Sequence, residues 1–409
     1  MKITRCRSCG SSNLHPVLSL GETPLANALI WKEHLDIPEP KFPLEVVFCS
    51  DCTLVQITET VPPEILFRDY VYYSSFSDTV VKNGQQITDR ILNSRSLGPD
   101  SLVVEIASND GYLLNFYKQA GIPILGIEPA INIAKYAEEH GVATLAEFFN
   151  ESLANWLKRE GRQADVFHAN NVLAHVADLN GVVAGMGIIL KDQGIGVIEF
   201  PYVKDMIDGV EFDTIYHEHL CYYSLTSVSW LFERHGMKIV DVERIPIHGG
   251  SLRIFVAHNI EENLVSDRVA VLRQEELGWG VNDLSFYEQF GAKVEGLRNA
   301  LTACLYDLKI NGKKIAAYGA SAKGATLLNT FGIGADTIKF VVDRSTIKQG
   351  LYTPGTHLPI LDPEQLMVEK PDYVLLLTWN FAEEILNQQV EYRNSGGKFI
   401  VPIPRLEIV

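Results

Sequence analysis

Three features are missing from this chain of 409 residues. No run approaches the eighteen or so consecutive apolar residues of a membrane span. The N-terminus reaches Cys6 without the apolar core of a secretory signal. Basic residues are outnumbered, with 35 Lys and Arg against 51 Asp and Glu, whereas nucleic-acid binding needs clustered positive charge. We therefore expect a cytoplasmic protein with neither a membrane nor a nucleic acid as its partner.

The remaining composition is that of a soluble globular protein, with 46% hydrophobic and 21% charged residues. The length predicts two or three domains, each able to bury its own core. Composition does not decide the oligomeric state, so a monomer and a small homo-oligomer both remain open.

Four of the six cysteines form two CxxC pairs, Cys6 with Cys9 and Cys49 with Cys52. Each pair can deliver two thiolates to one tetrahedral ion. The alternatives are a redox motif, which needs only one CxxC, and two disulfides, which the cytosol disfavours. We predict a structural zinc site, because four cysteine ligands leave no open position for catalysis.

From about residue 70 onward, short buried strands alternate with helical patterns, which predicts a doubly wound α/β sheet. Residues 260–310 contain no strong strand signal and are predicted to form a helical connector. A second α/β unit follows. The predicted strands lie at 101–106, 124–128, 165–170 and 196–200, and then at 314–319, 339–343, 373–377 and 398–401.

The segment Glu105-Ile-Ala-Ser-Asn-Asp-Gly111 joins a predicted strand to a helix. Methyltransferases that use S-adenosylmethionine often place an acidic residue, small residues and glycine at this turn. Ala107 and Asn109 replace two of the usual glycines, but Asn tolerates a left-handed backbone. Glu128 ends the next strand, where a carboxylate can bind ribose hydroxyls. An ordinary β-α turn is the alternative.

A second candidate loop, Tyr318-Gly-Ala-Ser-Ala-Lys-Gly324, opens a helix. Its backbone amides, serine and lysine could hold a pyrophosphate, and Asp343 follows at a strand tip. The glycine pattern is incomplete for a nicotinamide dinucleotide. That ligand and a loop without any ligand both remain open.

The densest acid/base chemistry lies in Tyr216-His217-Glu218-His219. His219 is the predicted base, because imidazole titrates in the range that proton abstraction needs. His217 is the least expected participant, since adjacent side chains tend to point in different directions. The alternatives are polar residues buried for packing, and a metal bound by His217 and His219.

These motifs together resemble the nucleotide-sugar C-methyltransferases of deoxysugar biosynthesis over nearly the whole chain. The motifs that carry the resemblance include both CxxC pairs, the segment Gly21-Glu-Thr-Pro-Leu-Ala-Asn27 and Tyr70-Val-Tyr-Tyr-Ser-Ser75. The others are the two loops above, Asn170-Asn171-Val172-Leu-Ala-His175, the Tyr216–His219 run and His248-Gly-Gly-Ser-Leu-Arg253.

The resemblance implies a zinc-binding domain (1–68), an S-adenosylmethionine domain (69–262), and a helical connector with a Rossmann-like sugar-nucleotide domain (263–409). It also implies methylation beside the ketone, at C-3, of a nucleotide-linked 4-keto-6-deoxyhexose through an enolate. A nicotinamide-dependent oxidoreductase or epimerase is the alternative enzyme.

On this reading the site residues form three groups. The catalytic candidates are His219, Tyr216, Glu218, His175, and Tyr70 or Tyr72. The candidates for contact with the cofactor are Glu105, Ala107, Ser108, Asn109, Gly111, Glu128, Pro129, Asn170, Asn171 and Val172. The candidates for contact with the sugar nucleotide are His248, Ser251, Tyr318, Ser321, Lys323, Asp343, Arg344, Trp379 and Asn380.

Overall fold

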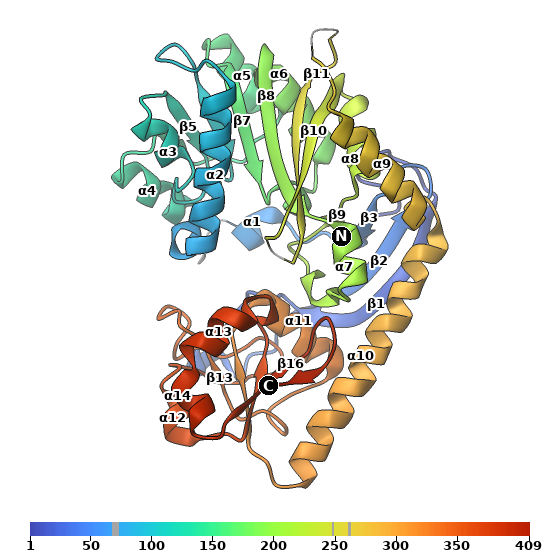
Figure 1. Ribbon diagram of the computed structural model, residues 1–409, viewed down its shortest axis with the longest axis vertical. Coiled ribbons are helices and arrows are strands. Elements are labelled where there is room, and N and C mark those ends of the chain that lie inside the picture. Colours follow the sequence, from blue (N-terminus) through green and yellow to red (C-terminus); the bar gives the residue numbers. More distant parts are fainter. Residues whose placement is uncertain (68–72, 248, 261–262) are drawn as a thin grey trace.

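The computed structural model describes residues 1–67, 73–247, 249–260 and 263–409. Three sheets organise the chain. The central and C-terminal sheets belong to two α/β units, and the long helix α10 (Leu284–Ile310) runs between them (Figure 1). The N-terminal sheet lies beside the central unit, and its strands β1 and β2 extend toward the C-terminal unit (Figure 1). The chain thus has the predicted α/β fold with a separate N-terminal module. None of the described helices is long and apolar enough to cross a membrane.

The N-terminal sheet is antiparallel, with strand order β1-β2-β3-β9. Its last strand, β9, belongs to a distant part of the sequence, directly after the Tyr216–His219 run. Val55 of β3 pairs with Tyr222 of β9, so the active-site candidates are joined to the N-terminal module by a strand ladder. The elements are β1 (Leu14–Pro24), η1 (Lys32–His34), β2 (Lys41–Cys49), β3 (Val55–Ile57) and β9 (Cys221–Tyr222).

The central sheet has seven strands in the order β10-β11-β8-β7-β4-β5-β6. Strands β4 to β8 are parallel, whereas β10 and β11 form an antiparallel hairpin against β8. The sequence patterns predicted β4, β5, β7 and β8 and missed β6 and this hairpin. The strands are β4 (Val103–Ile106), β5 (Ile124–Ile127), β6 (Thr144–Leu145), β7 (Ala164–Asn170), β8 (Leu190–Pro201), β10 (Met237–Ile245) and β11 (Ser251–His258).

Helices follow and cover these strands. Several begin at a side-chain cap, as at Ser77, Asn150 and Ser224, which satisfies amides that the first helical turn leaves without partners. The helices are α1 (Pro63–Phe67), η2 (Ser74–Phe76), α2 (Asp78–Ser94), α3 (Leu114–Gln119), α4 (Ile131–Glu139), α5 (Glu151–Arg159), η3 (Leu173–His175), α6 (Leu179–Ile189), α7 (Val203–Asp208), η4 (Phe212–Thr214) and α8 (Leu225–Glu233).

The order of the central strands reverses between β4 and β7. The chain runs from β4 outward through β5 and β6, and then returns to place β7 on the other side of β4. In open α/β sheets, ligands bind outside the carboxyl ends of the strands at such a reversal. The loop 107–111 follows β4, and Asn170 ends β7, so both cofactor motifs lie at this point.

The predicted helical connector consists of α9 (Asp267–Trp279) and α10. The C-terminal sheet has the order β14-β13-β12-β15-β16-β17, parallel except for β17. Its strands are β12 (Ile315–Tyr318), β13 (Val341–Val342), β14 (Ile360–Leu361), β15 (Tyr373–Leu376), β16 (Lys398–Val401) and β17 (Glu407–Ile408). Its helices are α11 (Ala322–Phe331), α12 (Gln365–Glu369), η5 (Trp379–Phe381), α13 (Ala382–Gln388) and α14 (Val390–Asn394).

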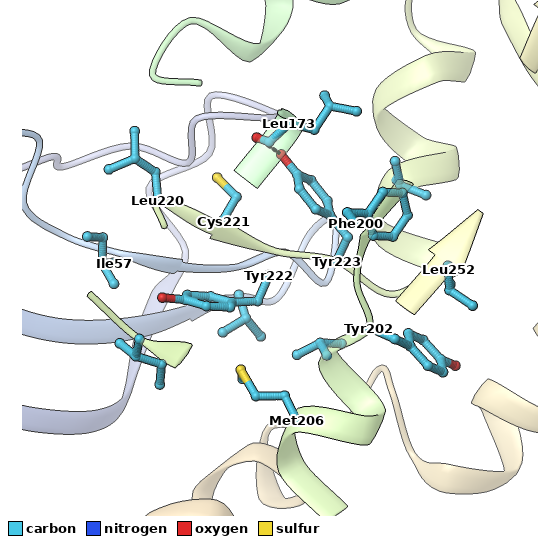
Figure 2. Packing of buried hydrophobic residues seen from close by; sticks show 14 of the residues in the cluster. Ile57, Leu173, Phe200, Tyr202, Met206, Leu220, Cys221, Tyr222, Tyr223 and Leu252 are labelled. Carbon is cyan, nitrogen blue, oxygen red and sulfur yellow. Dashed lines mark hydrogen bonds between the residues drawn. The ribbon is translucent and has the colours of Figure 1, made fainter. Parts of the chain in front are cut away.

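One hydrophobic cluster extends through all three units. Figure 2 shows the part around β9, where Cys221 and Tyr222 lie between Ile57 of the N-terminal sheet and Phe200 of the central sheet. The Tyr223 hydroxyl donates to the Leu173 carbonyl at 2.9 Å. The segment that carries the acid/base residues is therefore followed by buried residues that pack between the two sheets.

Candidate active site

The loop after β4 has the strained backbone of a tight turn. Ala107 and Asn109 adopt φ values of 46° and 50°, and Gly111 adopts 79°. A Cβ on Gly111 would lie 2.6 Å from the Val142 side chain, so only glycine fits there. The expected left-handed turn at Asn109 is present, and Ala107 shares that conformation at a cost that a glycine would avoid.

Two buried carboxyl groups shape this loop. Glu128 accepts hydrogen bonds from the backbone amides of Asn109 at 2.9 Å and Ala130 at 2.8 Å. Burial raises the pKa of Glu128, and it raises the pKa of Glu105 well above its usual range, reinforced by the nearby Asp110. Glu128 thus already orders the loop, and its contact with ribose hydroxyls stays a prediction.

Several buried polar atoms at this end of the sheet have no hydrogen-bond partner among the described residues. A buried polar group without a partner costs about 1–3 kcal/mol, so a group of them in one place indicates a ligand site. Three lie on or beside the β4 loop, and three lie at the end of β7. They are Glu105 Oε2, Ser108 Oγ and Asp110 Oδ1, and Asn170 Oδ1, Asn170 Nδ2 and Asn171 Oδ1.

The chain passes over this loop before α2 begins. The Ser74 amide donates to Asn109 Oδ1 at 2.8 Å, and the Ser75 amide donates to Asp110 Oδ2 at 3.0 Å. Tyr70 and Tyr72, the two tyrosines between which the sequence did not choose, lie outside the described residues, as does His248.

His219 lies in a short chain of hydrogen bonds. Its Nδ1 is 2.8 Å from the Thr214 carbonyl, and its Nε2 is 2.9 Å from the Tyr216 hydroxyl. A carbonyl can only accept, so Nδ1 carries a proton. In the neutral ring Nε2 is then the basic nitrogen, and Tyr216 donates to it.

His175 on η3 completes this aromatic group. Its ring packs edge-on against His219, with the ring centroids 4.7 Å apart, and Phe67 packs against its other side. Burial lowers the pKa of His175 to about 4. His175 is therefore neutral near pH 7 and can donate or accept a hydrogen bond without carrying a charge.

The other two residues of the run face the N-terminal module. His217 is buried, and its Nε2 lies 3.2 Å from the Pro43 carbonyl of β2. Glu218 accepts a hydrogen bond from Asn27 Nδ2 at 2.7 Å, and burial raises its pKa to about 7. His217 and His219 thus have different partners, as expected from their adjacency. The motifs did not single out Asn27 as a site residue.

The C-terminal unit contacts the residues just before the run. Trp379 Nε1 donates to Asp213 Oδ2 at 2.7 Å, and Lys323 Nζ lies 3.8 Å from Glu211 Oε2. Lys323 Nζ is buried without a hydrogen bond and lies 4.6 Å from the centre of the Trp379 ring. Burial raises the pKa of Glu211 to about 7. Glu211 and Asp213 belong to no motif that the sequence analysis used. Only the packing of α11 and η5 against them shows that they lie at the site.

A cleft of about 830 Å³ opens beside these contacts. Residues from α2, the end of β10, the segments 246–247 and 249–250 and the C-terminal unit line it, together with Ser77. They include Gly249, Trp379 and Asn380. A Cβ on Gly249 would lie 2.2 Å from the Glu211 carboxylate. The glycines beside His248 thus make room for a carboxylate of the protein itself.

Comparison with known proteins assigns this chain. It is 35% identical over 407 residues to the C-methyltransferase NovU of Streptomyces niveus, covering 100% of this chain and 97% of that protein. Three family models match along it, a putative zinc binding domain at 6–67, a methyltransferase domain at 83–242 and a C-methyltransferase C-terminal domain at 246–404. The chain belongs to the S-adenosylmethionine-dependent C-methyltransferases. Its reaction is therefore methyl transfer. It is not the nicotinamide-dependent chemistry that the sequence left open.

Two solved structures are more distant. The magnesium protoporphyrin IX methyltransferase of Synechocystis PCC 6803 with bound SAM is 12% identical and covers 46% of this chain and 85% of its own, at a TM-score of 0.33. A SAM-dependent methyltransferase of Anabaena variabilis is 11% identical and covers 42% and 83%, at a TM-score of 0.35. Likenesses this distant carry no information about ligands.

The polar atoms at the carboxyl ends of β4 and β7 fit the cofactor of this C-methyltransferase. S-adenosylmethionine carries an ammonium, a carboxylate and two ribose hydroxyls. Glu105 and Asp110 can accept from the ammonium, and the Asn170 amide can donate to the carboxylate. When bound, the cofactor supplies an electrophilic methyl group.

The four paired cysteines of the C-methyltransferase form one cluster. Their sulfur atoms lie within 4.8 Å of one another. The Sγ atoms of Cys6 and Cys52, and those of Cys9 and Cys49, are 3.5 Å apart, close to the ~3.8 Å between thiolates that share a tetrahedral zinc. Gln56 Nε2 also donates to Cys6 Sγ at 3.1 Å. The cluster fits a structural zinc, and among the described residues it is the one group of His, Cys, Asp and Glu arranged for a metal.

Several residues that were predicted to contact the sugar nucleotide already interact with other groups of the protein. Ser321 Oγ caps α11 by accepting from the Gly324 amide at 3.1 Å, and Asp343 accepts from the Ala320 and Ser345 amides. Ser251 is fully buried and donates to the Ile247 carbonyl. Arg344 lies at the surface near Glu384.

Proposed function

We propose that this C-methyltransferase methylates C-3 of a nucleotide-linked 4-keto-6-deoxyhexose through an enolate. A sugar carbon becomes nucleophilic only when a neighbouring ketone makes its proton acidic. The site must therefore supply a base, donors for the enolate oxygen and an aligned methyl group. The observation that carries the proposal is the chain Thr214–His219–Tyr216, which presents a basic imidazole nitrogen next to a phenol.

In this proposal His219 Nε2 accepts the proton from C-3, either directly or through the Tyr216 hydroxyl. The Thr214 carbonyl holds Nδ1–H, which fixes the ring and stabilises the imidazolium that forms. Neutral His175 and Tyr216 are hydrogen-bond donors of the kind that stabilise an oxyanion. The resulting enolate carbon would be the nucleophile, and bound S-adenosylmethionine would supply the methyl group that it accepts.

The nucleotide would extend from this centre into the cleft beside the C-terminal unit. Trp379 and Asn380 line that cleft, and Lys323 Nζ provides a cation without a hydrogen bond beside it. A diphosphate oxygen could bind Lys323 in place of Glu211, whose pKa of about 7 makes its carboxyl easy to neutralise.

The substrate class is tested by incubating the enzyme and S-adenosylmethionine with dTDP-, GDP-, CDP- and UDP-linked 4-keto-6-deoxy sugars. We expect one nucleotide series to gain a methyl group at C-3, as located by NMR. The matched 4-hydroxy sugars, which cannot enolise, should remain unmethylated. Methylation of a 4-hydroxy sugar, or of none of the keto sugars, would refute the proposal.

The location of the nucleotide is tested separately with Lys323→Met. We expect the KM for the sugar nucleotide to rise about tenfold or more, since hydrogen bonds to charged groups contribute about 1.5–3 kcal/mol. The affinity for S-adenosylmethionine should not change. If only the melting temperature falls, Lys323 serves solely as an ion-pair partner of Glu211.

A further inference from the structure

The N-terminal module places the Phe42 ring against His217 and the Asn27 amide against Glu218, two residues of the catalytic run. Asn27 lies in the turn after β1, and its Nδ2 donates to Glu218 Oε1 at 2.7 Å across 191 residues of sequence. Glu218 is only 4% exposed. The zinc cluster is at the other end of β1 and β2, next to Leu14 and Cys49, which pair with each other.

We propose that Asn27 is a positioning residue for methyl transfer, supplied by the zinc-binding module to hold the Glu218 carboxylate in its working orientation. The proposal rests on the proposed methyl transfer and on the prediction that Glu218 is one of its catalytic residues. The zinc-binding module would then contribute to the reaction itself. The four cysteine ligands explain only how zinc folds the module.

The chemistry of the pair supports this. A carboxamide donates a hydrogen bond without adding a charge, so it orients a carboxylate and leaves its proton exchangeable. Burial raises the pKa of Glu218 to about 7, and the hydrogen bond from Asn27 opposes that rise. An arginine in place of Asn27 would keep the carboxylate ionised and remove it from proton chemistry.

The module is attached to the central unit by other contacts. The β3–β9 ladder and the contact of His217 with the Pro43 carbonyl already join the two. Asn27 is therefore not needed to hold them together. The titratable groups near Glu218 are His217 and His219 on its own segment and His175 on η3, whose ring contacts the Glu218 backbone.

The first test compares Asn27→Ala and Asn27→Asp with the wild type. Losing the hydrogen bond should lower kcat about 10- to 100-fold, because hydrogen bonds to charged groups are worth about 1.5–3 kcal/mol. The acid limb of the kcat profile should move to higher pH, most in Asn27→Asp, where a second carboxylate faces the first. Asn27→Gln should recover part of the activity.

Asn13→Ala is the matched control. Asn13 belongs to the same module and also donates its amide to a carboxylate, that of Asp51, but at the surface. Its kcat and pH profile should equal those of the wild type. All variants should keep their zinc and their affinity for S-adenosylmethionine. A normal kcat and pH profile in Asn27→Ala would overturn the proposal.

A double-mutant cycle with Glu218→Gln separates positioning from structure. If Asn27 acts through Glu218, adding Asn27→Ala to Glu218→Gln should lower kcat no further. The proposal would be overturned if the fold-losses in kcat of the two single variants multiply in the double variant.

A readout without turnover keeps this test independent of the substrate assignment. In protein with ¹³C-labelled glutamate, the infrared band of the protonated Glu218 carboxyl is identified by its loss in Glu218→Gln. That band should persist to higher pH in Asn27→Asp than in the wild type. An unchanged titration would overturn the proposal, whereas failure of the sugar assay would leave this measurement intact.

Discussion

The two strand-loop-helix turns, after β4 and after β12, look alike in sequence but use their polar groups differently. After β4, Ser108 Oγ and Asp110 Oδ1 are buried without partners. After β12, Ser321 caps its helix, and Asp343, which follows β13, accepts from the Ala320 amide of that turn and from the Ser345 amide. A motif thus marks a ligand site most strongly where its polar groups are buried and not already used by the fold. On the second loop two described side chains are exceptions, because Lys323 Nζ and the Tyr318 hydroxyl are buried without a hydrogen-bond partner.

The largest effect is expected beside the first turn, from His219→Gln. Removing the base should lower kcat about 10²- to 10⁴-fold, the usual contribution of a general base. The dissociation constant for S-adenosylmethionine, measured by calorimetry, should not change. Turnover near that of the wild type would remove His219 as the base and would leave Glu218, with a pKa of about 7, as the next candidate.

Lys323 on the second turn is tested through its ion-pair partner Glu211, by measuring how the stability of Glu211→Gln depends on pH. Because burial raises the pKa of Glu211 from 4.5 to about 7, the native state binds more protons than the unfolded state in that interval. Its contribution to stability is therefore full below about pH 4.5 and is lost as pH rises through 7, by about 3 kcal/mol. Denaturant unfolding of Glu211→Gln should show a flatter dependence on pH. An unchanged slope would mean that the carboxyl titrates normally.

In the first turn and at the end of the adjacent strand β7, Ser108→Ala and Asn170→Ala should weaken S-adenosylmethionine binding by about 10- to 100-fold, if each removes a hydrogen bond to a charged part of the cofactor. Stability should change little, because neither side chain's polar atoms bond to the protein. Lower stability with normal affinity would place these atoms in the fold.

The smallest effect is expected from the matching serine of the second turn. Ser321→Ala should cost about 1 kcal/mol of stability through loss of the helix cap, while KM values stay within about twofold. A rise in the KM for the sugar nucleotide without loss of stability would make the two turns equivalent.

Local patterns predicted much of this protein. The CxxC pairs predicted the sulfur cluster, and strand signals at 101–106, 124–128, 165–170 and 196–200 predicted the parallel core. The β10–β11 hairpin was missed, because its charged residues obscure the apolar pattern at the edge of the sheet. Strand β9 was missed because two residues carry no periodicity.

The sequence by itself determined which chemistry is present: four thiolates spaced for one metal, a turn for a cofactor, and imidazoles beside a carboxyl and a phenol. These depend on neighbours along the chain, so spacing reveals them. Only the tertiary structure decided which of these groups contact one another. Asn27 contacts Glu218, Lys323 faces Glu211 and Trp379 contacts Asp213, because burial and packing join residues that are distant in sequence and follow no local pattern.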